Sequence, residues 1–155
     1  AVSGIVASSP FLKLAFEPPA WKLAFGKTMR KIYPSLTLSN EINPIHRSHD
    51  TEVVKAYIAD PLNHDRVSPN YSVLLMETGS WAIQNAGRLK KPVLIIHGME
   101  DQLTSYKGSE AFAANNQYMV KIKLYPGAYH ELHNEPGREE VLKDVTDWLS
   151  KQLQF

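Results

Sequence analysis

Hydrophobic residues form three short runs in this chain that are typical of β-strands. Residues 93–96 are four consecutive aliphatic residues behind Pro92, a pattern typical of a strand buried on both faces of a parallel sheet. Residues 121–125 alternate between polar and apolar side chains, which indicates a second strand with one face near solvent, at a sheet edge. The short β-branched run at residues 4–7 predicts a third, buried strand that ends before Pro10.

Apolar residues at helical spacing predict helices between and after these strands. A long helix is expected at residues 68–85, with Ser68 as its N-cap and one apolar face turned inward. That face consists of Tyr71, Leu74, Leu75, Thr78, Trp81 and Ala82. Further helices are expected at residues 105–115 and from residue 136 onward. This order of strands and helices predicts an α/β fold with a parallel sheet flanked by helices.

The stretch 11–66 differs from the rest of the chain. It holds five of the ten prolines and shows no alternating strand pattern. Within it, apolar spacing predicts an amphipathic helix at residues 21–32 and a short helix at residues 50–57. We therefore expect a sheet core formed by residues 1–10 and 67–155, interrupted by a helical cap, or lid, at residues 11–66.

Composition limits the classes of protein that this chain can belong to. Its 155 residues are enough for one domain with a hydrophobic core. A net charge of +1 gives no electrostatic reason to expect a nucleic acid partner, and no run approaches the ~20 apolar residues of an integral membrane segment. Cysteine is absent, which excludes disulfides and thiolate metal sites and favours a reducing, cytoplasmic location. The first eight residues resemble a strand more than a signal peptide, so a truncated chain is expected.

Two titratable residues follow neighbouring strands of the predicted sheet. Asp101 comes just after the run at 93–96, and His130 comes after the strand at 121–125 and a Pro-Gly turn. Open α/β sheets hold their chemistry at the carboxyl ends of the strands. An acid followed by a histidine on successive strand ends is the second half of a hydrolase triad. Asp101 and His130 are therefore the candidate catalytic pair, although an Asp after a strand is also common as a simple turn residue.

The first half of such a triad is missing from the sequence. No Gly-x-Ser-x-Gly turn occurs in the chain, and no oxyanion loop precedes the first strand. Ser8 and Ser9 follow a strand, but they lack flanking glycines and a proline comes next. The chain alone is therefore not expected to hydrolyse esters.

The remaining polar residues near these strand ends suggest other roles. His130 and His133 are too close for the His-Glu-x-x-His zinc spacing, so a metal hydrolase is the weaker alternative and neither metal nor cofactor is expected. His97 is expected to bond to backbone at its strand end, and Glu131 is expected in a solvated loop.

Two segments resemble the α/β-hydrolase superfamily, and more closely its monoacylglycerol lipase and lysophospholipase branch. They are Pro-Val-Leu-Ile-Ile-His-Gly-Met-Glu-Asp at 92–101 and the Gly-Ala-Tyr-His-x-x-His-x-Glu run at 127–135, supported by Asp-Pro-Leu at 60–62. The resemblance covers essentially the whole chain, but only as the C-terminal part of such an enzyme. It implies that Asp101 is the triad acid and His130 the general base, and that residues 11–66 are a mobile cap.

The resemblance also implies a substrate and a reaction. In the complete enzyme, a serine carboxylic-ester hydrolase would act on lipid-like esters such as monoacylglycerols or lysophospholipids, without a cofactor. Leu12, Leu14, Phe16, Trp21 and Phe25 could line an acyl-chain pocket, or could simply pack the cap onto the sheet. A thioesterase, peptidase or haloperoxidase could use the same acid and base. The main alternative is a non-catalytic binding module that forms a homodimer or is completed by an N-terminal polypeptide.

Overall fold

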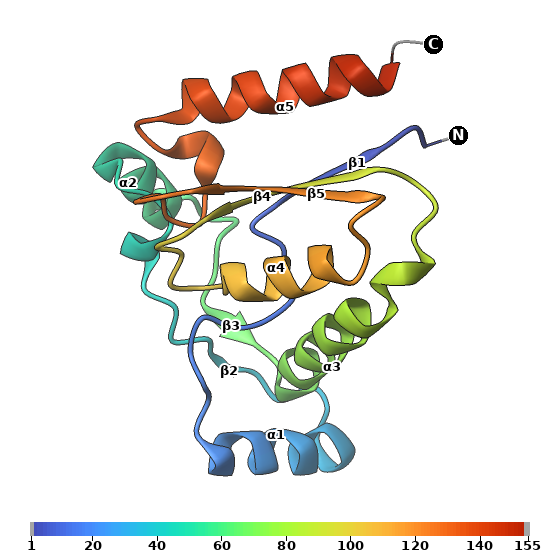
Figure 1. The fold of residues 1–155 in the computed structure, drawn as a ribbon. Coiled ribbons are helices and arrows are strands. Elements are labelled where there is room, and N and C mark those ends of the chain that lie inside the picture. The colour runs from blue at the N-terminus through green and yellow to red at the C-terminus, as the bar shows by residue number, and fades with distance from the viewer. Residues whose placement is uncertain (1, 154–155) are drawn as a thin grey trace.

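Strand β4 (Val93–Gly98) lies at the centre of a three-stranded parallel sheet in the computed structural model, which describes residues 2–153 (Figure 1). It pairs with β1 (Ile5–Ser8) on one side and with β5 (Val120–Tyr125) on the other. All six residues of β4 are buried, which confirms the prediction from its aliphatic run. The carboxyl ends of β4 and β5 are adjacent, as the site prediction requires.

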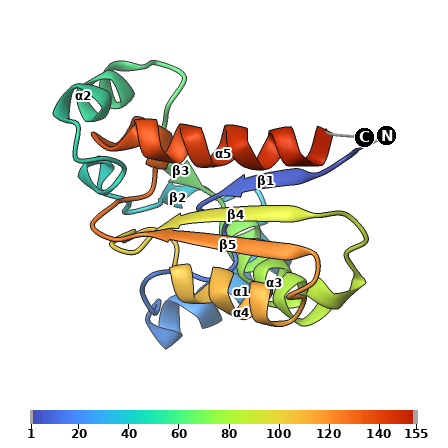
Figure 2. The same cartoon turned by 45° about the horizontal axis from the view of Figure 1, so that its top comes forward.

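Helices cover both faces of this sheet (Figures 1 and 2). Helix α5 (Arg138–Leu153) lies over one face, and helices α3 (Pro69–Asn85) and α4 (Tyr106–Ala114) lie over the other. The α/β fold predicted from the order of elements is thus confirmed. Helix α5 begins two residues after Pro136, and a short 3-10 helix (Ala86–Arg88) follows α3.

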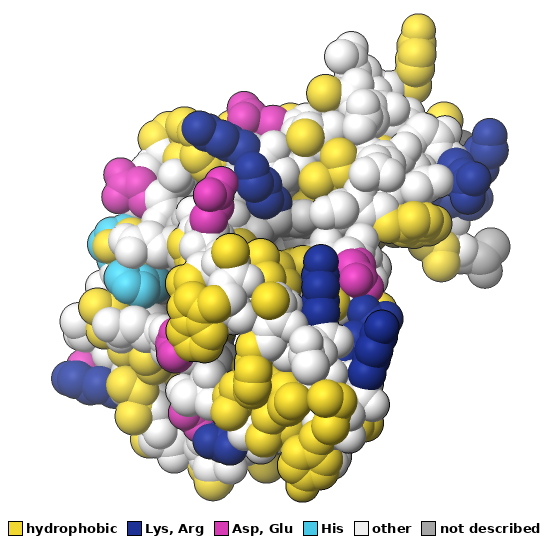
Figure 3. Space-filling view, turned by 90° about the horizontal axis from the view of Figure 1, so that it is seen from below, with side chains coloured by type: hydrophobic (Ala, Val, Ile, Leu, Met, Phe, Trp, Pro, Cys, Tyr) yellow, Lys and Arg dark blue, Asp and Glu magenta, His cyan; other side chains and the backbone are white. Residues whose placement is uncertain are grey.

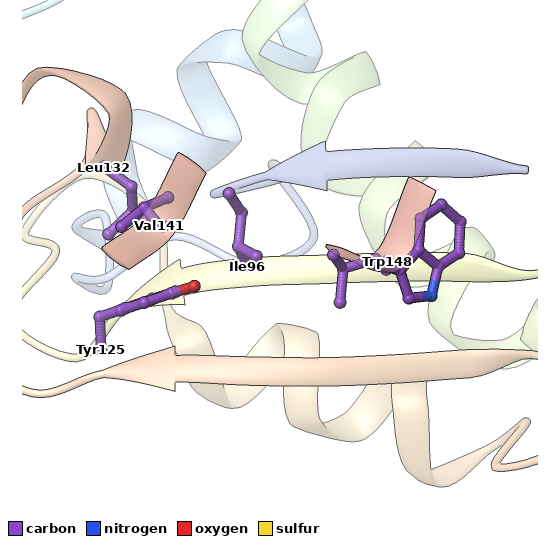
Figure 4. Close-up of a cluster of buried hydrophobic side chains, with 6 residues drawn as sticks. Ile96, Tyr125, Leu132, Val141 and Trp148 are labelled. Atoms are coloured by element: carbon purple, nitrogen blue, oxygen red, sulfur yellow. The ribbon is translucent and has the colours of Figure 1, made fainter. Parts of the chain in front are cut away.

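Alternate residues of the strands build two separate hydrophobic clusters, one on each face, as the pleat of a sheet requires. On the α4 face, Val93 and Ile95 pack with Ala113 and Val120. The cluster on the α5 face is larger, and Figure 4 shows most of it. Its buried members are Leu94, Ile96, Tyr125, Leu132, Val141 and Trp148. Leu132 belongs to a 3-10 helix (Leu132–Asn134) in the loop after β5, so this core reaches the segment that carries His130.

Strand β1 is less buried than its sequence predicts. Ile5 is 42% exposed, and within residues 2–153 β1 pairs only with β4, so its other edge is open. The apolar composition is typical of a strand that is paired along both edges, but no second strand of the described chain pairs with β1. The prediction of a fully buried strand is therefore wrong for this chain.

The outward face of helix α3 carries large apolar side chains that the periodicity predicts to be buried. Tyr71, Leu74 and Trp81 are each at least 50% exposed. The helix packs instead through its opposite face, where a Cβ atom on Gly79 would lie 2.5 Å from the carbonyl oxygen of Leu12. Periodicity correctly finds an apolar face, but no element of the described chain covers it. The inward placement of these three residues is wrong, and so is that of Thr78, which is also exposed.

The stretch between β1 and α3 holds three helical segments joined by loops. Helices α1 (Ala20–Ile32) and α2 (Thr51–Ala59) confirm the two predicted there, and a 3-10 helix (Pro44–His46) lies between them. Two short strands that the sequence does not predict, β2 (Leu38–Ser39) and β3 (Arg66–Val67), form an antiparallel pair. This pair is stabilised by the Arg66 guanidinium, which donates hydrogen bonds to both the carbonyl and the hydroxyl oxygen of Thr37.

Helix α1 presents apolar side chains to solvent. Trp21 is 66% exposed and Ile32 69%, whereas the only fully buried residue of the helix is Gly26. Figure 3, viewed from the side of α1, shows hydrophobic side chains gathered there with lysines and arginines between them. No helix within residues 2–153 is both long enough and apolar enough to cross a bilayer.

Candidate active site

The carboxylate of Asp101 lies in the turn that follows β4 and has no solvent exposure. Its Oδ1 accepts hydrogen bonds from the backbone N–H groups of Leu103 (2.7 Å) and Thr104 (3.0 Å). Its Oδ2 accepts from the Thr104 hydroxyl at 2.8 Å, and also faces His97 Nε2 at 3.2 Å and His130 Nδ1 at 2.7 Å. A buried carboxylate with this many donors is held in one orientation.

These donors also control the protonation of Asp101. Burial alone would raise the pKa of Asp101, but hydrogen bonds from His130 and His97 outweigh burial and hold the pKa of this carboxyl well below its usual value of 3.8. The group is therefore a carboxylate at neutral pH, as the acid of a catalytic triad must be.

His130 lies in the loop after β5 and contacts Asp101 through one ring nitrogen. A carboxylate only accepts, so Nδ1 carries the proton and donates it to Oδ2 over 2.7 Å. In the neutral ring this leaves the lone pair on Nε2, and the side chain is 25% exposed. A partly exposed ring that carries a lone pair on Nε2 and is held at Nδ1 by a carboxylate is the arrangement of a general base.

His97 makes side-chain contacts in the site that its sequence position does not predict. Its ring is completely buried, and Nε2 lies 3.2 Å from both Asp101 Oδ2 and the Thr104 carbonyl oxygen. Both are acceptors, so Nε2 carries the proton and Nδ1 of the neutral ring accepts from the Ser109 hydroxyl at 2.8 Å. The predicted backbone partner of His97 is the Thr104 carbonyl, whereas its partners at Asp101 and Ser109 are side chains. A polar residue ending an aliphatic strand, four positions before an acid, is the signal that indicates such a contact.

Gly98 allows the two candidate catalytic loops to touch. A Cβ atom at this position would lie 2.3 Å from the carbonyl oxygens of both Ala128 and Tyr129. The backbone N–H of Glu100 also donates to the Ala128 carbonyl at 3.1 Å. The end of β4 therefore passes directly against the loop that carries His130, and only glycine leaves enough room.

The segment before α2 is fastened to the same histidine loop. The N–H of Glu131 donates to the Arg47 carbonyl at 2.8 Å, and the Arg47 guanidinium pairs with the Glu131 carboxylate at 2.8 Å. Burial raises the pKa of Glu131, but the bond to Arg47 outweighs it and lowers the pKa overall. Both side chains are less than 20% exposed, so the prediction that Glu131 lies in a solvated loop is wrong. The unpredicted partner, Arg47, is 84 positions away in sequence.

The residues predicted to line an acyl-chain pocket are scattered. Phe16 and Leu14 border a cavity of about 400 Å³ that also reaches Asp101. Leu12 is half-buried and packs beside Gly79, whereas Trp21 and Phe25 are exposed and lie outside that cavity. Their role in substrate binding stays a prediction. Among residues 2–153, no three His, Asp or Glu side chains gather as metal ligands, and His133 is exposed.

The low pKa of Asp101 predicts how acid destabilises the chain. The unfolded state takes up this proton near pH 3.8 and the folded state only at lower pH, so the stabilisation is complete above about pH 5 and is lost as the pH falls. We expect the difference in free energy of unfolding between the wild type and Asp101→Asn to shrink by on the order of 2 kcal/mol between pH 6 and pH 2.5. Urea titrations across this range measure it. Asp65→Asn, on an exposed residue, is the control, and a difference that does not change with pH would contradict the prediction.

A parallel sheet covered by helices on both faces, with an acid and a histidine at adjacent strand ends, is the architecture of an α/β-hydrolase. The chain belongs to the α/β-hydrolase family described as Serine aminopeptidase, S33, which matches residues 1–137.

Two individual relatives and one solved structure are similar to this chain over nearly its whole length. The chain is 33% identical over 153 residues to a monoacylglycerol lipase of Mycolicibacterium smegmatis, covering 97% of this chain and 54% of the lipase. It is 30% identical over 154 residues to an uncharacterized abhydrolase domain-containing protein of Dictyostelium discoideum, covering 98% of this chain and 16% of that protein. The solved structure of Paleococcus ferrophilus monoacylglycerol lipase superposes with a TM-score of 0.91 at 34% identity, covering 97% of this chain and 60% of that one. The chain thus spans about half the length of the mycobacterial lipase and only a small part of the Dictyostelium protein.

Proposed function

We propose that this chain supplies the acid and the general base of a serine ester hydrolase, with Asp101 and His130 in these roles. The observation that carries the proposal is the 2.7 Å bond between a fully buried Asp101 carboxylate and a partly exposed His130 ring. The nucleophilic serine belongs to the part of the hydrolase fold that these 155 residues do not contain, since no Gly-x-Ser-x-Gly turn is present.

In the complete enzyme, His130 Nε2 takes the proton of the serine hydroxyl as its oxygen attacks the ester carbonyl. Asp101 stabilises the resulting imidazolium through the Nδ1–H bond, and His130 returns the proton to the leaving alcohol. An acyl-enzyme remains. Water attacks its carbonyl as His130 takes one of the water protons, and His130 then passes this proton to the departing serine oxygen, which releases the acid and restores the serine. Neither step needs a cofactor.

Monoacylglycerol-like esters are the proposed substrate class. The support comes from two relatives named monoacylglycerol lipases, from Mycolicibacterium smegmatis and Paleococcus ferrophilus, each at least 33% identical to this chain. The exposed apolar side chains on α1 and at Phe16 give an ester with an acyl chain an apolar surface to meet.

The chain by itself is expected to show no turnover. Without a nucleophile, pure protein should not hydrolyse a short acyl ester and should not react with a fluorescent fluorophosphonate, which labels only activated serines. Labelling followed by a denaturing gel measures this. A labelled band at 17.5 kDa would show that the chain holds a nucleophile and would refute this division of the triad.

Complementation tests the catalytic roles directly. The part of the Mycolicibacterium smegmatis lipase outside the match is fused ahead of this chain or supplied as a second polypeptide; we call the product the complemented enzyme. We expect the fluorophosphonate to label the added part, and His130→Ala to abolish labelling. His133→Ala, on the exposed histidine of the same loop, is the matched control. Equal labelling of the His130→Ala and wild-type proteins would contradict the proposal.

A second candidate is a non-catalytic fragment that binds another polypeptide. It is favoured by the open edge of β1 and by the exposed apolar face of α3 at Tyr71, Leu74 and Trp81, since exposed strand edges and large apolar patches promote association. A homodimer could cover both surfaces. Light scattering over a range of concentrations tests the homodimer. A chain that stays monomeric at every concentration would count against self-association.

A further inference from the structure

Ser9 has an unusual backbone conformation for a residue that is not glycine. Its φ angle is +42°, it is only 4% exposed, and it comes directly after the carboxyl end of β1. Its N–H donates to the Ile96 carbonyl at 2.9 Å, so the residue is held against the central strand. A left-handed serine persists only where the surrounding contacts enforce it, and such positions cluster at functional sites.

Those contacts reach both members of the candidate catalytic pair. The Ser9 hydroxyl donates to the backbone carbonyl of His130 at 2.7 Å. The Ser9 carbonyl lies 3.3 Å from the Thr104 hydroxyl, the same hydroxyl that donates to Asp101 Oδ2 at 2.8 Å. One residue on β1 thus touches the acid turn after β4 and the histidine loop after β5.

Ser9 is not placed to act as a nucleophile. Its hydroxyl proton is already donated to a carbonyl, which cannot accept it as a base would during attack. The position is buried, and the neighbouring Pro10 removes a backbone N–H that an oxyanion site could use.

We infer that Ser9 is a positioning residue that holds the His130 loop against the Asp101 turn. This inference rests on the proposed catalytic roles of Asp101 and His130. The hydroxyl bond fixes the position of the histidine loop relative to the end of β1. The strained backbone places the Ser9 carbonyl beside the Thr104 hydroxyl. The first function needs the hydroxyl donor, which both alanine and glycine lack. Glycine also relieves the backbone strain, whereas alanine keeps it.

Proton NMR of the chain itself tests the inference without any need for activity. The His130 Nδ1 proton, buried against Asp101, should exchange slowly with water in the wild type. We expect exchange to be roughly five- to tenfold faster in both Ser9→Ala and Ser9→Gly, since each loses one hydrogen bond. The melting temperature should separate the two variants: Ser9→Gly should melt at least ~2 °C above Ser9→Ala because its positive φ carries no strain.

One control variant separates a general structural effect from positioning of the histidine. Ser150→Ala removes a hydroxyl-to-carbonyl bond of 2.8 Å on the far helix α5 and should leave the His130 signal unchanged. If Ser9→Ala lowers the melting temperature but leaves the exchange rate at the wild-type value, or if the wild type shows no slowly exchanging His130 proton, the inference is wrong. In the complemented enzyme, Ser9→Ala and Ser9→Gly should both slow fluorophosphonate labelling, since each loses the hydroxyl bond to the His130 carbonyl. Absence of all labelling in the wild type, with the NMR result intact, would refute the catalytic proposal and leave the positioning contact standing.

Discussion

Asp101→Asn is expected to lower kcat of the complemented enzyme by about 10⁴-fold. Two backbone N–H groups point at the Oδ1 position, so the amide oxygen of asparagine must occupy it and the NH₂ group must face His130. The ring then has to present a lone pair at Nδ1 and carry its proton at Nε2. That tautomer cannot accept the proton of a serine, so the loss comes from the wrong protonation of His130 and not from a lost charge alone.

Steady-state hydrolysis of a short acyl ester measures this effect. Glu100→Gln is the matched control, because Glu100 is the exposed carboxylate next to Asp101 in sequence and should change kcat less than about twofold. A tenfold or smaller loss for Asp101→Asn would mean that another group orients His130.

Leu132→Ala is expected to cost about 3–4 kcal/mol of unfolding free energy. Leu132 has 0% exposure and belongs to the cluster that joins β4, the loop after β5 and α5. Truncating it leaves a cavity beneath the loop that carries His130, and the melting temperature should fall by roughly 10 °C.

Urea unfolding of the chain gives the corresponding free energy. Leu62→Ala makes the same change at a residue that is 87% exposed and should alter stability by no more than about 0.5 kcal/mol. Equal effects of the two substitutions would show that the loop after β5 is not part of the packed core.

The fold was largely predictable because its signals are local. Four aliphatic residues in a row identify β4, and helical spacing identifies α3, α4 and α5, whatever surrounds them. What covers each face is not a local property. The pattern that locates the apolar face of α3 does not tell whether another element covers that face, so the exposure of Trp81 could not be predicted from it.

The candidate site, too, was predictable where its signals are local and not where they join distant parts of the chain. The order of Asp101 and His130 after two successive strands was enough to predict that they meet, and they lie 2.7 Å apart; their catalytic role stays a prediction. The contacts of Ser9 and Arg47 with the histidine loop join residues 121 and 84 positions apart. No spacing rule links such distant residues, so only the three-dimensional arrangement of the strands reveals them.

Because there is no room for a side chain at position 98, Gly98 limits the substitutions that this site can accept. Any other residue there would push a Cβ atom into two carbonyl oxygens of the histidine loop. Gly137, with no atom within 4 Å of a Cβ atom, could accept many side chains. In a saturation library selected for hydrolysis by the complemented enzyme, position 98 would remain glycine while position 137 drifted. New specificities would therefore have to arise at positions other than 98, in the surrounding loops and helices.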